Sequence, residues 1–448
     1  MRLRPVLRFG LALTLIASLA LALQPRALAA RGISLIRDAE IEADLRRMTA
    51  PILEAAGLGV DSINLYIVND DRLNAFVAGG MNLFLNTGFI MRTEHVGQLV
   101  GVMAHEIGHI SGGHLSRVGA AQRQAAAEMI LAAVLGAAAA VAGAPQLGTA
   151  IITGGQSYAQ TNFMTFTRSQ EQAADQAALT YLDRAGLSAR GLAEFFKVLE
   201  TQNLLAVSAP NPYLRSHPLT RERMQFVEGH LQRQEADAST VPEGWELAHS
   251  RMVAKLRAFL NDPRQVIDRY AQGDGLVERY ARAIAYYRLP DLPRALGEID
   301  GLLADYPDDP YFHELKGQML FENGRVEAAV GPYREAVRLQ PTSALLRIGL
   351  AQALIETGAP DANQDAIGYL EEAIHHERTN PTAWRLLGIA QGRNGLEGRS
   401  ALSFAEYALL IGKQDDARLY AKRAEARIEP SDPAWLRLQD ILRVIEQG

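Results

Sequence analysis

The stretch VGVMAHEIGHISGGHL, residues 100–115, decides how the rest of the chain is interpreted. It contains the motif H-E-x-x-H, formed by His105, Glu106 and His109. On a helix, residues four positions apart share a face, so the two imidazoles can bind one zinc ion. Glu106 lies between them and can act as the general base on a water molecule. Apolar residues of helical period surround the motif, and a glycine pair follows it as a stop.

The third protein ligand that a catalytic zinc site needs must come from elsewhere in the chain. We predict Glu171, on a helix expected over 168–185, with Asp175 one turn later to orient a zinc-bound histidine. An ordinary solvated helical face is the alternative for this carboxylate pair. A histidine ligand shortly after the motif, as in metzincins, is disfavoured because His114 comes one residue early, a rotation of about 100° on a helix. His114 is therefore given a supporting or structural role.

Composition limits the classes of protein that the chain can belong to. Its 448 residues suffice for two or three domains. The formal net charge of −6, without a long basic run, argues against nucleic acid as the main partner. The absence of cysteine rules out disulfides, thiolate zinc sites and a lipid-modified N-terminal cysteine.

The first 29 residues have the pattern of a secretory signal peptide. Arg2, Arg4 and Arg8 form a basic start, and a Leu- and Ala-rich apolar run follows over 9–23. Small residues then provide an A-x-A cleavage site at 27–29. We expect cleavage and export to the periplasm; an uncleaved anchor helix is the alternative.

A small sheet is expected before the motif helix. A helix over 38–56 precedes a strand over 63–68, and two short strands follow on either side of a glycine turn at Gly79-Gly80. The motif helix should begin near Glu94. The second short strand is predicted to bind an extended substrate by strand addition, through Met81, Asn82, Leu83, Phe84 and Leu85.

An alanine-rich segment over 121–144 follows, and 129–144 carries no charge. One interpretation is a segment that enters or touches a membrane. The favoured one is a helical hairpin or flap packed over the site, because alanine is weakly apolar and the run is short for a span. Glycines between 143 and 155 favour a mobile connection over a continuous helix.

The C-terminal part reads as a helical repeat. A polar linker is expected over 228–244, and small and aromatic residues then recur with a period of about 34 residues, as in tetratricopeptide repeats. Tyr286, Tyr333, Gly317 and Trp384 are among the repeating positions. A plain helical bundle is the alternative. Stacked repeats form a curved solenoid whose concave face binds protein segments.

Four motifs in fixed order carry a family resemblance: NAFVAGG (74–80), HEIGH (105–109), RSQEQAAD (168–175) and SHP (216–218). Together they resemble the gluzincin zinc metalloproteases that include HtpX and the CAAX prenyl proteases. The export signal and the C-terminal repeats resemble most closely the periplasmic β-barrel-assembly-enhancing proteases of this family. The resemblance covers nearly the whole mature chain.

The resemblance implies a role for each matching residue. His105, His109 and Glu171 would bind one Zn²⁺ per chain, and Glu106 would be the catalytic base. Asp175 would support a zinc-bound histidine. His217 would either coordinate the zinc in a closed, self-inhibited state or assist at the transition state. Arg223 occupies a position where the family often has an arginine near the active site.

The predicted fold class is therefore α+β, mainly α: a zinc-protease domain with a small sheet, then an all-α repeat solenoid. Expected boundaries are 1–29 for the signal peptide, 30–228 for the protease, 229–275 for a linker and helical connection, and 276–448 for the repeats. The predicted function is periplasmic zinc-dependent cleavage of misfolded or stalled outer-membrane β-barrel proteins. The repeats would bind substrate or the barrel-assembly machinery, with membrane contact through 129–144 left open. The alternative is a chaperone or scaffold with little proteolysis.

Overall fold

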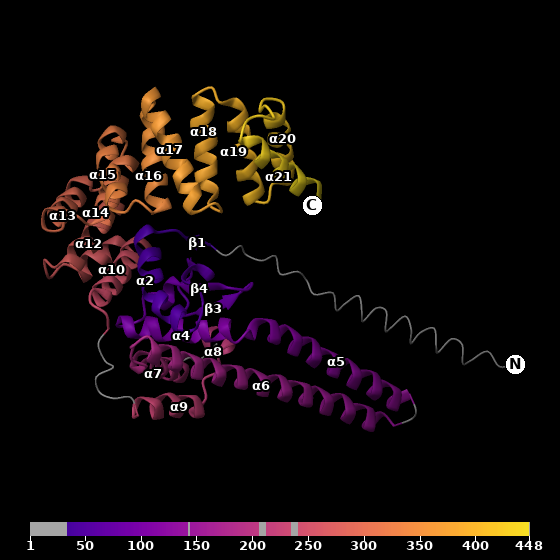
Figure 1. Ribbon diagram of the computed structural model, residues 1–448. Coiled ribbons are helices and arrows are strands. Elements are labelled where there is room, and N and C mark those ends of the chain that lie inside the picture. Colours follow the sequence, from indigo (N-terminus) through magenta and orange to yellow (C-terminus); the bar gives the residue numbers. More distant parts are fainter. Residues whose placement is uncertain (1–33, 142–143, 206–211, 234–240, 448) are drawn as a thin grey trace.

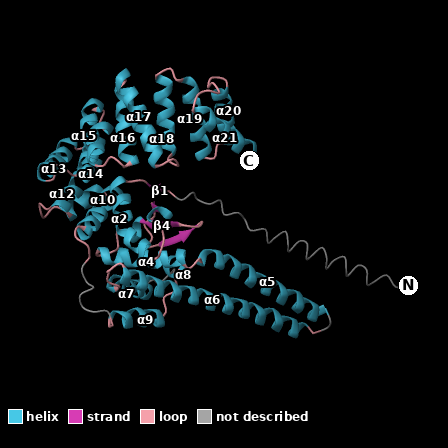
Figure 2. Cartoon of the chain, in the orientation of Figure 1, coloured by secondary structure: helices cyan, strands magenta, loops and turns pink. Residues whose placement is uncertain are grey.

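A computed structural model describes residues 34–141, 144–205, 212–233 and 241–447, so the expected signal peptide lies outside the described residues (Figure 1). The chain is mainly helical, with one four-stranded sheet near the start and an array of helical pairs after it. Figure 2 shows how small the share of strand is. The predicted fold class, α+β and mainly α, is confirmed.

The sheet contains β1 (Leu35–Ile36), β2 (Asn64–Val68), β3 (Ala75–Ala78) and β4 (Asn82–Asn86), in the order β1-β2-β4-β3. β2 and β4 run parallel, and the two outer pairs are antiparallel. The turn between β3 and β4 uses Gly79 and Gly80 at positive φ angles of 57° and 96°, which other residues rarely adopt. The three strands expected from the sequence are present.

The strand predicted to receive substrate is not at an edge. β4 pairs with β2 on one side and with β3 on the other, so the backbone of 82–86 is already used. Strand addition through Met81, Asn82, Leu83, Phe84 and Leu85 is therefore wrong on topological grounds. β3, the neighbour of β4, is the edge strand on this side of the sheet. It packs beside the helix that carries the H-E-x-x-H motif.

The core of the N-terminal body, residues 34–231, forms around two helices. α2 (Ala39–Ala55) begins at Asp38, whose side chain accepts a hydrogen bond from the Ile41 amide, and it buries a stripe of apolar residues. α4 (Val96–Ser111) carries the motif and is buried on nearly all sides. The short elements η1 (Val60–Ser62) and α3 (Thr87–Ile90) connect these helices to the sheet. α7 (Arg190–Leu205) covers α4, and a Cβ at Gly101 would meet the Leu192 backbone nitrogen at 2.7 Å.

The alanine-rich segment is a helical hairpin, as predicted, but it does not pack over the site. α5 (His114–Val141) and α6 (Pro145–Arg184) run side by side and project away from the body (Figure 1). The prediction of a mobile connection is wrong from Pro145 onward, because α6 is one continuous helix with that proline in its first turn. Gly148 lies inside α6, where it faces Gly136 of α5 and lets the two backbones approach closely.

Four further helices lead to the repeats: α8 (Pro212–Ser216), α9 (Arg221–Leu231), α10 (Trp245–Leu260) and α11 (Pro263–Arg269). α10 belongs to both parts of the molecule. Trp245 and Met252 lie in the hydrophobic core of the N-terminal body, whereas Ala254 and Ala258 lie in the first core of the repeat array. In the region expected as a linker and helical connection, 229–275, α10 therefore packs into both parts.

The repeat array consists of helical pairs that curve beside the N-terminal body (Figure 1). Its first helix is α12 (Leu276–Arg288), followed by α13 (Leu292–Asp305), α14 (Pro310–Glu322), α15 (Val326–Leu339), α16 (Ala344–Thr357), α17 (Pro360–His376), α18 (Pro381–Arg393), α19 (Glu397–Leu410), α20 (Gln414–Glu425) and α21 (Ala434–Gln447). Two predicted positions, Tyr333 and Gly317, pack against each other. Gly388, also predicted, packs against Phe404, which was not.

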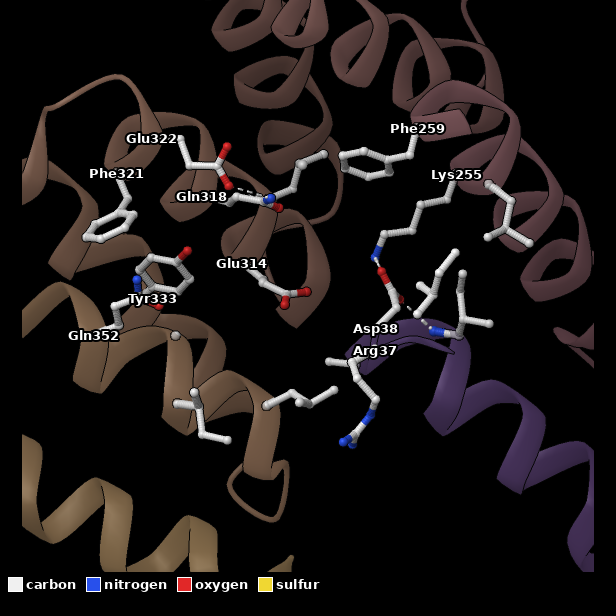
Figure 3. Close-up of a pocket in the computed structure, with 18 of the residues that line it drawn as sticks. Arg37, Asp38, Lys255, Phe259, Glu314, Gln318, Phe321, Glu322, Tyr333 and Gln352 are labelled. Carbon is white, nitrogen blue, oxygen red and sulfur yellow. Dashed lines mark hydrogen bonds and ion pairs between the residues drawn. The ribbon is translucent and has the colours of Figure 1, made fainter. Parts of the chain in front are cut away.

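A junction of charged side chains connects the body to the repeats. Lys255 of α10 pairs with Asp38 and Glu40 at the start of α2, at 2.7 and 3.1 Å. Beside it lies a cavity of about 560 Å³ between β1, α2, α10 and α14–α16. Figure 3 shows Lys255 reaching Asp38 in this cavity, with Glu314 and Tyr333 across it on the repeats.

Candidate metal centre

Two helices bring most of the site together. α4 supplies His105, Glu106 and His109, and α6 supplies Glu171 and Asp175; all five side chains are buried. The helices can touch because position 108, in the middle of the motif, is a glycine. A Cβ there would meet the carbonyl oxygen of Ala174 at 2.7 Å, which is too short for any side chain.

A third segment adds His217, directly after α8. Its backbone N–H donates to the Tyr213 carbonyl at 2.7 Å, which continues the α8 turn. The two rings stack with centroids 4.6 Å apart. Tyr213 therefore fixes the direction in which the buried His217 ring points, toward the motif helix.

The donor atoms of four side chains converge on one point. His105, His109, Glu171 and His217 each offer one ligand atom, and these atoms lie within 4.8 Å of one another. The Nε2 atoms of His105 and His109 are 3.1 Å apart, and they lie 3.4 and 3.3 Å from the two Glu171 carboxylate oxygens. His217 Nδ1 completes the set at 3.4 Å from His105 Nε2 and 3.2 Å from Glu171 Oε1.

These separations fit a tetrahedral ion. Ligands that bind zinc at 2.0–2.1 Å in a tetrahedron lie about 3.3 Å from one another. The alternative, imidazole nitrogens hydrogen-bonded among themselves, leaves lone pairs facing each other unless protons are shared. Nitrogen and oxygen donors at these distances are the set that zinc prefers, so the residues present fit the metal.

Asp175 and Arg223 hold the ligands from outside. Asp175 Oδ1 lies 2.9 Å from Nδ1 of His105, so it can fix the tautomer that leaves Nε2 free. Arg223 of α9 binds both oxygens of Asp175, at 2.6 and 2.9 Å, and its Nη1 lies 2.8 Å from Glu171 Oε2. His114 supports the other ligand histidine, with its Nδ1 2.9 Å from His109 Nδ1.

Glu106 differs from its neighbours. It is fully buried, and neither carboxylate oxygen has a hydrogen-bond partner within the described part of the chain. The nearest polar group is His217 Nε2, at 3.5 Å from Oε1. Burial raises the pKa of Glu106, against the opposing effect of His217 and His105. A buried carboxylate without partners is costly, which is typical of a group kept for proton transfer.

The electrostatics of the site are set by burial and by the central carboxylates. Burial lowers the pKa of His109 to about 3. Burial also lowers the pKa of His105, but the Asp175 and Glu171 carboxylates outweigh it and raise the value to about 9. Burial would raise the pKa of Glu171, yet the surrounding histidines hold it well below its usual value. Glu171 therefore stays ionised as a ligand requires.

Sequence reasoning named most of this site. The structure brings together all seven side chains that it assigned to metal binding or catalysis: His105, Glu106, His109, Glu171, Asp175, His217 and Arg223. It missed Tyr213 and Gly108. Tyr213 comes four positions before His217, a spacing that would have suggested a contact if a helix had been expected there.

Comparison with known proteins agrees with this geometry. Residues 37–231, which contain the whole site, match the model of Peptidase family M48. This part of the chain is a metallopeptidase domain of family M48. Residues 280–344, which span α12 to α15, match a tetratricopeptide repeat model.

Relatives share both parts. The Beta-barrel assembly-enhancing protease of Yersinia pestis is 27% identical over 370 residues, which are 82% of this chain and 75% of that protein. The protein of the same name from Escherichia coli (strain K12) is 25% identical over the same shares of the two chains. The M48 domain and its repeats therefore occur together in these relatives as one aligned unit.

Proposed function

We propose that the protein is a zinc-dependent endopeptidase of the periplasm, acting on misfolded or stalled outer-membrane β-barrel proteins. The observation that carries the proposal is the close group of four donor atoms with Glu106 beside it, a buried carboxylate that has no hydrogen-bond partner among the described residues. The relatives' name, beta-barrel assembly-enhancing protease, supports the link to barrel assembly. The basic and apolar start of the sequence supports export.

The chain's own residues have separate tasks in this reaction. His105, His109 and Glu171 would hold a zinc ion, which would supply Lewis-acid chemistry at the scissile carbonyl and would lower the pKa of a water molecule. Glu106 accepts the proton of the attacking water and delivers it to the leaving amine. Asp175 keeps the His105 ring in position, and Arg223 holds Asp175 through two hydrogen bonds.

His217 closes the site in this conformation. Its Nδ1 lies at the fourth corner of the donor group, where a water or a substrate carbonyl would have to bind. The segment after α8 must therefore move before cleavage. We expect that His217→Ala raises the rate of proteolysis; a fall to background would mean that His217 assists the reaction instead.

Substrate would bind along β3. Its outer edge is free for strand addition, and the strand lies beside α4. An unpaired β-strand, the state of a barrel protein before assembly, fits such an edge. A photocrosslinking residue at Val77 of β3 should capture an unfolded barrel protein. The same residue at Tyr66 is the matched control and should not, because β2 is an inner strand that pairs with β1 through Ile67 and Val68 and with β4 along its length.

A second function, as a chaperone or scaffold, is favoured by the repeat array. Tetratricopeptide repeats bind protein segments, and here they offer a surface for clients or for the assembly machinery. Glu106→Gln distinguishes the two functions. If barrel assembly in cells needs cleavage, the variant should fail to support it; if the variant supports it fully, the scaffold function dominates.

A further inference from the structure

The outer part of the α5–α6 hairpin has no charge. No Asp, Glu, Lys or Arg occurs between positions 129 and 167. α5 contains a window of mean hydropathy 1.7, high enough for a membrane helix, and only 11% of that window is buried. The core helix of a soluble protein would pass the same composition test, but it would be mostly buried. We name residues 129–141 and 144–159 the hairpin tip.

Large apolar side chains of the hairpin tip face outward. On α5, Ile130 is 65% exposed, Val134 60% and Val141 87%. Met129, Leu131 and Leu135 of the same helix are also exposed, as are Leu147 and Tyr158 of α6. Isolated exposed apolar residues are common, but a continuous surface of them marks an interaction site.

Two hydroxyl groups of the hairpin tip are satisfied by the backbone of their own helix. The hydroxyls of Thr149 and Thr153 donate to backbone carbonyls one turn earlier, at 3.1 and 2.9 Å. Gly136 and Gly148 face each other so closely that a Cβ on either would overlap the other backbone. Close contact through small residues stabilises helix pairs in lipid, where burial from water contributes nothing between helices.

The length of the hairpin tip limits how it can bind. The α5 part, 129–141, rises about 20 Å. The hydrocarbon of a bilayer is about 30 Å thick, so the hairpin tip fills one leaflet and cannot cross both. Three exposed arginines lie on the hairpin between its tip and the body, at the level expected for lipid headgroups: Arg117, Arg123 and Arg168.

We propose that the hairpin tip inserts into the hydrocarbon of one leaflet of a lipid bilayer and holds the body at the membrane surface. Lipid is the occupant that fits an uncharged pair of helices with large exposed apolar side chains. Binding of an unfolded client or of a second copy of the chain would not explain why both helices lack charged residues over this length. The proposal does not depend on proteolysis.

Flotation of the full-length mature protein with vesicles of phosphatidylethanolamine and phosphatidylglycerol tests this. The unmodified protein should float with the vesicles. The double variant Ile130→Glu/Val134→Glu should reduce the bound fraction at least tenfold, since it places two charges in hydrocarbon. Leu436→Glu is the matched control, because Leu436 of α21 is 75% exposed and lies outside the hairpin; it should float unchanged. Unchanged zinc content in each variant shows that the fold is intact.

The depth to which the hairpin tip inserts is tested separately, by quenching of tryptophan fluorescence. Tryptophan introduced at Val141, in the last turn of α5, should be quenched by lipids brominated in the middle of the acyl chain. Tryptophan at Gln122, nearer the body, should not be quenched. Absence of flotation, or flotation that the double variant leaves unchanged, would overturn the proposal. So would a dimer in light scattering without lipid that the double variant abolishes, because a second copy would then cover this surface.

Discussion

Two clusters of buried charge lie in this molecule, and they are built differently. At the junction of body and repeats, the cations Lys255 and Arg251 face Asp38, Glu40 and Asp309. At the metal centre, three imidazoles surround Glu171 with their nitrogens turned toward one another, and Glu106 has no hydrogen-bond partner among the described residues. The ion pairs of the junction form among side chains alone, whereas the crowded donor atoms of the metal centre fit a metal ion in addition to the Arg223 guanidinium.

The difference separates structural from functional burial of charge. A buried group with opposite charges at hydrogen-bond distance stabilises the fold once its neighbours are present. Donor atoms that crowd together without protons to share are destabilising until a metal binds. Burial and perturbed pKa values occur in both clusters, so neither property alone identifies the active site.

The largest effect should come from Glu106→Gln. Removing the general base should lower cleavage of an unfolded protein substrate by about 10²- to 10⁴-fold, with zinc content unchanged. Glu222→Gln, an exposed glutamate of α9, is the control and should keep full activity. Activity that survives Glu106→Gln would assign the proton transfer to another group.

Asp175→Asn should weaken the metal centre without changing any ligand. The amide cannot accept from His105 as strongly and cannot pair with Arg223, so zinc affinity should fall by about 10- to 100-fold. Competition with a fluorescent chelator measures this. Unchanged affinity would mean that the carboxylate only stabilises the packing of α6 against α9.

The junction should respond in the opposite way to Lys255→Met. The variant leaves Asp38 and Glu40 with less positive charge nearby, and the free energy of unfolding should fall by about 3–5 kcal/mol. Zinc content should stay the same. The control Lys316→Met removes a half-exposed ion pair with Asp300 and should cost no more than about 1 kcal/mol. Loss of zinc in Lys255→Met would contradict the separation of the two clusters.

The smallest effect is a pH dependence of stability at the junction. Burial raises the pKa of Glu314 to about 7, with Asp38 and Glu40 adding to the rise and Lys255 opposing it. The folded pKa lies above the unfolded value near 4.5, so the folded state holds the proton more tightly. Stability should therefore decline by at most about 3 kcal/mol as pH rises from 4.5 through 7. Glu314→Gln should flatten this part of the curve in thermal unfolding; an unchanged curve would assign the dependence elsewhere.

Local spacing explains why the metal centre could be predicted from the sequence. His105, Glu106 and His109 need only a helix to share a face, and the later motifs supplied Glu171 and His217 by resemblance. The free edge of the sheet could not be predicted in this way. β4 becomes an inner strand only because β2, which is separated from it by the whole of β3, pairs with it in parallel. The direction in which the hairpin projects could not be predicted either. It depends on α6 being one long helix, whereas the glycines in its first half had favoured a break.

The metal content of the purified mature protein tests the central claim most directly. Elemental analysis should find one zinc per chain in the unmodified protein and in Lys255→Met, and little in Glu171→Ala. That result would establish that the buried donors of α4 and α6 form the metal site and that the junction does not. Absence of zinc from the unmodified protein, purified without chelators, would contradict the account, as would full retention of zinc in Glu171→Ala.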